Sequence, residues 1–527
     1  MDRRARRERF QASPSPPGRG WREAPGEGRT NPHPALRATF SRREKDSPVA
    51  LWLFPLLLVL ASQTFAASTD LRLIQAIRGK DGAAVRTLVR ARADVNAAQG
   101  DGATALHWAV HYDDLATVDL LLQAGARVNA SNDLGVTPLY LACTNRNAAM
   151  VDRLLLAEAN PNASLLNGET VLMNCARTGN AASVKALLMA GASMNAKEPE
   201  HDQTALMWAA AEKHSGVVRA LLEAGVDFRA RSRAYSQTVT SEVTQRAGRE
   251  ELNYNVLRGG STALLFGARS GDVESVRLLL AAGADVNDSL PNGMSALVLA
   301  AHSGNGPAAS LLLEKGADPD AAAIGYTALH AAVLRSDLKL VHDLLAHGAN
   351  PDVRITNGTP LRRNSQDFNL PAVLIGATPY WLAAKFLEAD SMRALAAAGA
   401  NPSISLPDGT TPLMAAAGLK EASGVDRRGL SVLDGGRVPN ETAALEAVTV
   451  ALSQPNDLDA TGPAGDTALH AAASMGYDRV LRLLAEKGAN LNIKNTRGLT
   501  PLAIVTRRNS GGASPIAEFL RKSGAVE

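Results

Sequence analysis

Apolar and polar positions alternate along most of this chain in units of about 33 residues. Each unit holds two apolar stretches, and the first of them is opened by an alcohol that is in most cases followed by x-Leu. These alcohols are Thr104, Thr137, Thr170, Thr204, Thr262, Ser295, Thr327, Thr378, Thr411, Thr467 and Thr500. Their successive spacings are 33, 33, 34, 58, 33, 32, 51, 33, 56 and 33 residues. A fixed period is typical of a solenoid, and the three long spacings indicate insertions of about 25, 18 and 23 residues.

Turn and helix-boundary residues stand at fixed places in each unit. A glycine lies two residues before the alcohol in every unit but one, where Asp202 replaces it. The alcohol can cap a helix, and prolines such as Pro138 and Pro379 follow it at the first helical position. A second apolar stretch ends in a glycine suited to the left-handed stop of a helix. Each unit is therefore predicted to form two helices. Three units lack the glycine stop and are expected to be locally irregular there: they carry Arg92, Glu158 and Pro455.

A turn, two helices and a glycine stop in about 33 residues resemble the ankyrin repeat. The segments Thr104–His107, Thr327–His330 and Thr467–His470 are similar to the T-P-L-H signature, and Gly283–Asn287 matches the usual repeat ending. The resemblance covers roughly residues 70–527. It implies an all-α ankyrin-repeat solenoid of about twelve helix-turn-helix units with β-turn fingers. Met-containing variants at 206–210 and 413–416 are similar to secreted bacterial multi-repeat proteins.

The first 66 residues differ from the repeats. Residues 1–48 hold twelve Lys/Arg against six Asp/Glu and are rich in Pro and Gly, so they are expected to be disordered. The unusual length of this segment before the apolar run is also compatible with a translation start further downstream. Residues 49–66 contain an apolar run too short to span a bilayer, followed by the small-residue site Thr64-Phe65-Ala66. This pattern predicts a signal peptide and a periplasmic or secreted array over 67–527. An uncleaved signal anchor is the alternative, and it also places the repeats outside the cytoplasm.

Charge and motifs narrow the classes of function. The whole chain has 55 basic and 52 acidic residues, so removing residues 1–48 leaves 43 against 46, a net charge of −3. This balance argues against a nucleic-acid partner. The repeats contain no G-x-S-x-G, P-loop or dinucleotide fingerprint, so no enzyme activity and no cofactor are predicted. A monomer with a protein partner, and without a stable membrane span after signal cleavage, is expected.

The cysteines and histidines have structural interpretations. Cys143 and Cys175 lie on the first helices of adjacent repeats, and a spacing of about 10 Å between repeats exceeds the span of a disulfide. Buried free thiols are therefore predicted, with a disulfide as the alternative. His107 and His111 have helical i, i+4 spacing but lack the glutamate of a zincin, so no metal site is predicted. The resemblance implies that the signature histidines connect helix starts to neighbouring turns.

A candidate binding surface follows from the resemblance, which implies that the finger tips and the far ends of the first helices line a concave groove. Its candidate residues are Asp101, His111, Tyr112, Asp133, Leu134, Asn145, Asn167, Arg177, His201, Glu212, Arg258, Arg269, Asn292, His302, Tyr326 and Arg335. The mixture of Tyr, Arg and His favours a protein-binding surface, although unselected polar residues are the alternative. Trp108, Trp208 and Phe266 are expected to pack, with ligand contact as their second interpretation.

The insertions are expected near 229–259, 353–375 and 420–439. The first two interrupt fingers and could add contacts, while the third separates the two helices of one repeat; all three are equally compatible with inert loops. The sequence thus predicts an extracytoplasmic scaffold that binds another protein without catalysis. A structural envelope spacer, or an enzyme with a site built from the insertions, are the alternatives.

Overall fold

A computed structural model describes residues 70–245, 248–357, 374–419, 440–508 and 514–527, with backbone alone for 239–254. Thr69–Glu527 form one compact unit. The predicted disordered segment and signal peptide lie outside the described residues, as do the third insertion and most of the second. Those predictions therefore stay predictions.

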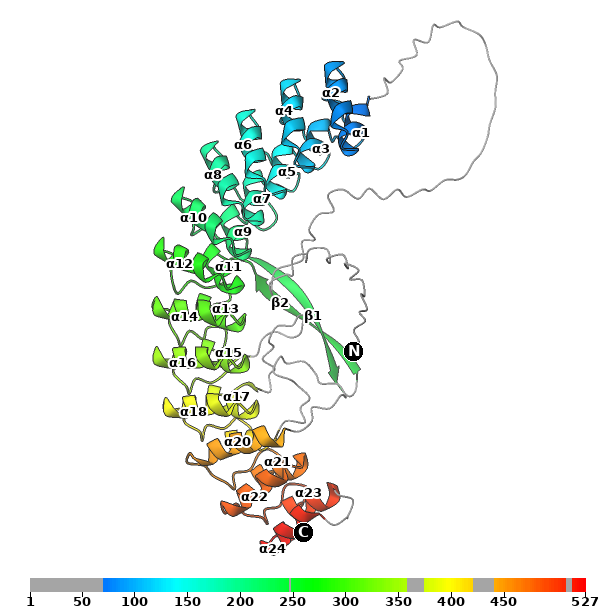
Figure 1. Ribbon diagram of the computed structural model, residues 1–527. Helices are drawn as coiled ribbons and strands as arrows, with labels where there is room; N and C mark the ends of the chain where they lie inside the picture. Colours follow the sequence, from blue (N-terminus) through cyan, green and yellow to red (C-terminus); the bar gives the residue numbers. More distant parts are fainter. Residues whose placement is uncertain (1–69, 246–247, 358–373, 420–439, 509–513) are drawn as a thin grey trace, which may run out of the picture. The chain divides into compact units, whose positions relative to one another are not determined.

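The described residues form twelve helix pairs, as predicted. The first helices are α1 (Arg72–Arg78), α3 (Ala105–His111), α5 (Pro138–Thr144), α7 (Val171–Thr178), α9 (Ala205–Ala211), α11 (Ala263–Ser270), α13 (Ala296–His302), α15 (Ala328–Leu334), α17 (Pro379–Lys385), α19 (Pro412–Ala416), α21 (Ala468–Met475) and α23 (Pro501–Arg508). The second helices are α2 (Gly82–Arg90), α4 (Leu115–Gln123), α6 (Ala148–Leu156), α8 (Ala181–Met189), α10 (Ser215–Glu223), α12 (Val273–Ala281), α14 (Gly306–Glu314), α16 (Leu338–Ala346), α18 (Ala389–Ala397), α20 (Glu441–Leu452), α22 (Asp478–Glu486) and α24 (Pro515–Lys522). Each first helix contacts the next one, and the second helices form the other layer (Figure 1).

The first helices begin at the predicted alcohols because these side chains cap them. The Thr137 hydroxyl, for example, accepts the backbone N–H of Tyr140 at 3.2 Å. In the first signature segment, Nδ1 of His107 accepts the N–H of Thr104 at 3.1 Å, and Nε2 lies 2.9 Å from the carbonyl oxygen of Val136 in the next finger. The ring thus connects a helix start to the neighbouring repeat, which is the role that the resemblance implied.

Helix ends without glycine are less irregular than predicted. Arg92 and Glu158 have φ angles of 57° and 63°, so they adopt the left-handed conformation of the glycine stops and the prediction of irregularity was wrong at both. At Pro455 the pyrrolidine ring fixes φ at a negative value, which excludes this conformation. There the side-chain amide of Asn456 donates to the carbonyl of Ala451 at the end of α20.

Cys143 and Cys175 form a disulfide, which corrects the prediction of free thiols. Their Cα atoms are 4.7 Å apart. The distance of about 10 Å used in the prediction describes the separation of packed helix axes, whereas residues that face each other between the axes lie much closer. Small residues at the equivalent places, such as Ala142 and Ala176, are fully buried and allow α5 and α7 to approach. The two sulfur atoms therefore lie within bonding distance.

The first insertion is a β-hairpin, which the sequence analysis missed. Antiparallel strands β1 (Tyr235–Gln245) and β2 (Gly248–Arg258) pair Tyr235 with Arg258 at the base and Gln245 with Gly248 at the far end. The base is held to neighbouring fingers, because Arg231 donates to the carbonyl of Gly260 at 2.8 Å and forms an ion pair with Asp288. The finger of the preceding repeat contributes Asp202, which pairs with Arg233 at 3.0 Å.

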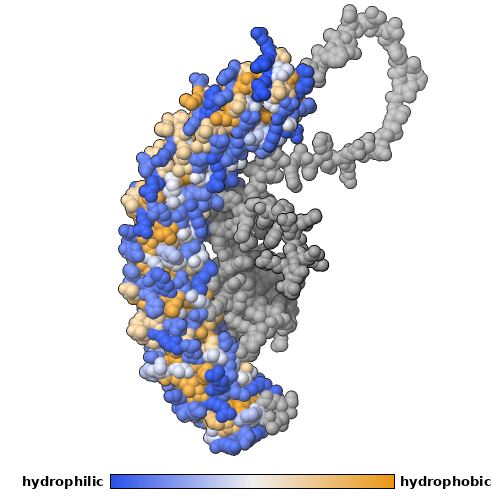
Figure 2. All heavy atoms as spheres, in the orientation of Figure 1, coloured by the Kyte–Doolittle hydropathy of each residue, from blue (hydrophilic) through white to orange (hydrophobic). Residues whose placement is uncertain are grey.

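The surface of the array is of mixed character. Hydrophilic and hydrophobic residues are interspersed over the face drawn in Figure 2. Leu156 and Met189, at the ends of α6 and α8, are 80% and 84% exposed. Across the described ranges, each helix falls short of the length and hydrophobicity needed to cross a bilayer.

Candidate functional site

The ends of the first helices and the fingers that precede them form one side of the array, here called the first-helix face. Six of the sixteen candidate residues are exposed on it: Asp101, Tyr112, Asp133, Leu134, Asn167 and Asn292. Eight are partly exposed: His111, Asn145, Arg177, His201, Glu212, Arg269, His302 and Arg335. Arg258 and Tyr326 are buried. The candidates are therefore mostly accessible, but they do not converge on a single pocket-like site.

The burial of Arg258 and Tyr326 corrects their assignment to an exposed surface, since their side chains are only 7% and 2% accessible. The Tyr326 hydroxyl lies 3.0 Å from Nδ1 of His302. Desolvation, together with the cations of Arg335 and Arg269, lowers the pKa of His302 to about 4. A neutral imidazole is therefore maintained at neutral pH, and Tyr326 supports the helix end rather than offering a contact surface.

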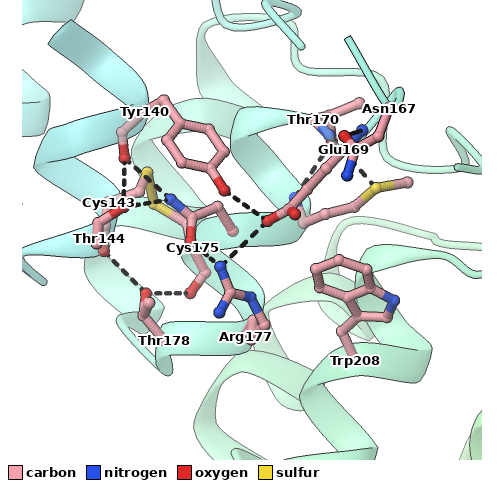
Figure 3. Close-up of polar contacts among 12 residues, drawn as sticks. Tyr140, Cys143, Thr144, Asn167, Glu169, Thr170, Cys175, Arg177, Thr178 and Trp208 are labelled. Atoms are coloured by element: carbon pink, nitrogen blue, oxygen red, sulfur yellow. Dashed lines mark hydrogen bonds and ion pairs between the residues drawn. A yellow bond between two sulfur atoms is a disulfide. The ribbon is translucent and has the colours of Figure 1, made fainter. Parts of the chain in front are cut away.

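The richest polar cluster lies between the third and fifth helix pairs and is named here the Arg177 cluster (Figure 3). At its centre is Glu169, a buried carboxylate in the finger before α7. Glu169 accepts the Tyr140 hydroxyl at 2.8 Å and an Nη2–H of Arg177 at 3.2 Å. Desolvation, followed by the charge of Glu169, raises the pKa of Tyr140. Tyr140 therefore stays protonated and donates to the carboxylate.

Asn174 connects this cluster to the neighbouring repeat. Its side-chain amide donates to the carbonyl of Tyr140 and to the hydroxyl of Thr144, both at 2.9 Å, while its oxygen accepts Arg177 at 2.9 Å. The disulfide lies among these bonds, and the Thr178 hydroxyl donates to the carbonyl oxygen of Cys143 at 2.9 Å. The two residues that bind the Arg177 guanidinium, Glu169 and Asn174, are thus themselves bonded to the preceding repeat.

The outer side of the Arg177 cluster is formed by the next repeat. The Arg177 guanidinium lies 5.7 Å from the ring centroid of Trp208, and the indole N–H of Trp208 donates to Gln203 at 2.7 Å. Desolvation raises the pKa of Glu212, and the charge of Arg177 partly offsets this effect. The structure therefore brings the predicted candidates Arg177 and Glu212 into electrostatic contact. Trp208 is partly exposed and packs against the hydrophobic core, as predicted.

A second cluster, here called the N-terminal aromatic cluster, consists of Arg78, Lys80, Trp108, His111 and Tyr112. The three rings are mutual neighbours, with centroid distances of 5.7 Å, 5.9 Å and 5.1 Å. The Arg78 guanidinium lies 4.8 Å from the Trp108 centroid, and the Lys80 ammonium lies 5.3 Å from that of Tyr112. The Trp108 indole donates to Gln99 at 2.7 Å, in the same manner as Trp208 does to Gln203.

Three exposed residues of the first-helix face were missed. Arg78 and Lys80 belong to the first helix pair, which has no alcohol from which to count, although Arg78 ends α1 as His111 ends α3, and Lys80 comes shortly after α1 as Tyr112 comes after α3. Leu166, in the finger before Thr170, is 80% exposed. Its position four residues before the alcohol was the signal that could have found it.

The histidines that the structure describes do not assemble a metal site. Both ring nitrogens of His107 are bound to protein groups, and desolvation lowers its pKa. His111 is instead part of the N-terminal aromatic cluster. Among the described residues, His, Cys, Asp and Glu side chains form no group of three that could hold a metal ion.

Comparison with known proteins assigns the family. A family model described as ankyrin repeats (three copies) matches residues 73–164, 147–232, 264–355 and 440–526, which is more than half of the chain. The chain belongs to the ankyrin-repeat family. It is similar to a solved human ASB11 ankyrin repeat domain, with 25% sequence identity, coverage of 47% of this chain and 98% of that chain, and a TM-score of 0.38. A search of curated proteins found no match. Ankyrin-repeat proteins are typically non-catalytic scaffolds for protein–protein interaction, and this chain has their architecture.

Proposed function

We propose that this ankyrin-repeat protein is an extracytoplasmic scaffold that binds another protein through its first-helix face, without catalysis. The observation that carries the proposal is the combination on one face of partly exposed Trp and Arg side chains with exposed Tyr and Leu. Trp, Tyr and Arg dominate the energetics of protein interfaces. Solenoids generally use one continuous face for binding, because each repeat contributes equivalent positions to it.

Two observations support a location outside the cytoplasm. Residues 49–66 have the pattern of a signal peptide. Independently, the array contains the disulfide Cys143–Cys175, and such bonds persist mainly in oxidising compartments. Sequencing the N-terminus of the protein purified from its source tests this location. A mature chain starting at Ala67 supports export and cleavage; a retained apolar segment supports the uncleaved anchor, and an unprocessed cytoplasmic chain contradicts the proposal.

The binding test uses crosslinking capture from a cell-envelope extract, with residues 67–527 as bait. Charge reversal of Arg177 is unsuitable, because it would place a second carboxylate against buried Glu169. Tyr112→Ala, Leu134→Ala and Leu166→Ala change exposed side chains of the first-helix face instead.

A matched control carries Leu156→Ala and Met189→Ala, which remove exposed apolar side chains from the second helices. Circular dichroism establishes that all baits are folded. One protein captured by the parent and the control but lost with the first-helix-face variant supports the scaffold proposal. Capture of the same set by all three baits contradicts it and favours a structural spacer.

A further inference from the structure

We infer that the N-terminal aromatic cluster binds an acidic peptide segment of the partner protein, in which carboxylates stand beside apolar side chains. This inference rests on the proposed function and specifies the partner's chemistry at one end of the first-helix face. Tyr112 is 36% exposed, Arg78 and Lys80 are exposed, and Trp108 and His111 are partly exposed. The cluster therefore presents an accessible ring surface bordered by two cations.

The two cations are not neutralised within the array. In the part of the chain that the structure describes, neither Arg78 nor Lys80 forms an ion pair; each lies over an aromatic ring instead. A cation–π contact leaves the full positive charge in place. Each cation is thus held against a ring on one side, and a carboxylate of a partner can approach it from the solvent side.

Nearby carboxylates are already engaged. Asp81 accepts the backbone N–H groups of Ala83 and Ala84 at 3.1 and 2.9 Å, which caps α2. Asp113 accepts the side-chain amides of Asn145 at 3.0 Å and Asn147 at 3.2 Å. These bonds hold both acids in structural positions.

Asp114 is engaged in the same way, since it accepts the backbone N–H of Thr117 at 2.9 Å and caps α4. Among the described residues, Arg78 and Lys80 contact rings and form no ion pair with these acids, so a partner can supply the complementary charge.

An acidic peptide fits this surface better than other occupants. Residues 1–48 of this chain have twelve basic and six acidic residues, so they do not complement it. A nucleic acid would need a basic groove that follows its backbone, whereas the first-helix face also carries the exposed acids Asp101 and Asp133, and the array has a net charge of −3. A peptide with alternating acidic and apolar residues can satisfy the cations and cover the rings.

The test measures fluorescence anisotropy of labelled twelve-residue probes. The probes are four Glu-Leu-Ser repeats, the Gln-Leu-Ser and Lys-Leu-Ser equivalents, and an oligothymidylate. The protein is residues 67–527, which contain the whole compact unit. The Glu peptide is expected to bind, the Gln peptide to bind more weakly, and the Lys peptide and oligonucleotide to show no binding.

The double variant Arg78→Glu, Lys80→Glu should weaken binding of the Glu peptide about tenfold, as two exposed ion pairs become repulsive. Arg86→Glu, Arg90→Glu makes the same change of charge on α2, where both side chains are exposed, and should leave affinity unchanged. Tyr112→Ala should weaken both the Glu and the Gln peptides, because it removes ring surface.

Absence of Glu-peptide binding, equal loss in both double variants, or preference for the Lys peptide or the oligonucleotide would overturn the inference. The capture experiment distinguishes failure of this inference from failure of the proposed function. If a captured partner is lost with the Leu134 and Leu166 substitutions but kept with Arg78→Glu, Lys80→Glu, the scaffold stands and the acidic-peptide site does not.

Discussion

The indole N–H of Trp381 donates to the backbone carbonyl of Thr410 at 3.0 Å, across the boundary between two repeats. Trp381 stands three residues after its alcohol, the position that His107, His330 and His470 occupy in the signature segments. Nε2 of His470 likewise lies 3.0 Å from the carbonyl oxygen of Leu499 in the following finger. Trp381 therefore replaces the signature histidine in its inter-repeat hydrogen bond while filling a larger volume of the core.

Replacing Trp381 with Phe should destabilise the array by about 1–3 kcal/mol, because it puts a smaller ring in the core and removes one of two donors to the buried Thr410 carbonyl, which also accepts the N–H of Leu406. The urea midpoint of the repeats around α17 reports this loss. Trp208→Phe is the matched control: its N–H bond to Gln203 is partly exposed, so water can replace it and the cost should be smaller. An equal or larger effect of Trp208→Phe would contradict this explanation.

Joint replacement of Cys143 and Cys175 by Ala should lower the free energy of unfolding of the surrounding repeats by about 3–4 kcal/mol. The bond closes a loop with a sequence separation of 32, and its removal restores chain entropy to the unfolded state. Denaturant unfolding of parent and variant without reductant measures the difference. The prediction fails if the denatured, unreduced parent reacts with a thiol reagent at two cysteines, since the bond would then be absent.

The free energy of unfolding should also decrease as the pH is lowered, because of His330. Desolvation by burial lowers the pKa of His330 to about 4, against 6.5 for an ordinary histidine. Because the unfolded chain binds the proton first, this contribution is complete above pH 6.5 and is lost as the pH falls towards 4. The parent should lose about 2–3 kcal/mol between pH 7.5 and 4.5 that the non-titrating variant His330→Gln does not lose. Parallel pH profiles for the two proteins would refute this assignment.

The sequence predicts features that depend on local order. The repeat period and the caps predicted the helix pairs that follow an alcohol, since an alcohol such as Thr137 caps its own helix with atoms close in the chain. Features that depend on the distance between repeats were missed. The Cys143–Cys175 bond needed the separation of facing Cα atoms rather than of helix axes.

The candidate surface was predicted less well, for a geometric reason. Tyr326, immediately before its alcohol, was predicted to be exposed, yet it is buried, as are Val136 and Glu169 at the same position of their repeats. At this position the chain turns into the first helix, so the side chain packs between neighbouring repeats. The hairpin was missed because the 33-residue period ends at the insertion, although the segment from Thr238 to Thr244 is rich in β-branched residues, which is typical of a strand.

The stops after α6 and α8 offer a comparison of two equivalent positions. Glu158 has φ 63° and Gly191 has φ 88°, and the carbonyl of each accepts an Asn side chain of the preceding finger at 3.1 and 3.0 Å. Glu158→Gly should stabilise the protein by about 0.5–1 kcal/mol, because relief of left-handed strain exceeds the added entropy of the unfolded chain. Gly191→Ala should destabilise it by about 1 kcal/mol.

The Gly191 change isolates backbone strain, because a Cβ there would meet no atom within 4 Å. Both accepting carbonyls also remain in the variants, so the hydrogen bonds from the Asn side chains at these stops are retained. Thermal unfolding of the parent and the two variants measures the opposite shifts. Shifts of the same sign would mean that Glu158 stabilises its turn through its side chain, and that the left-handed conformation is not the limiting cost at these helix ends.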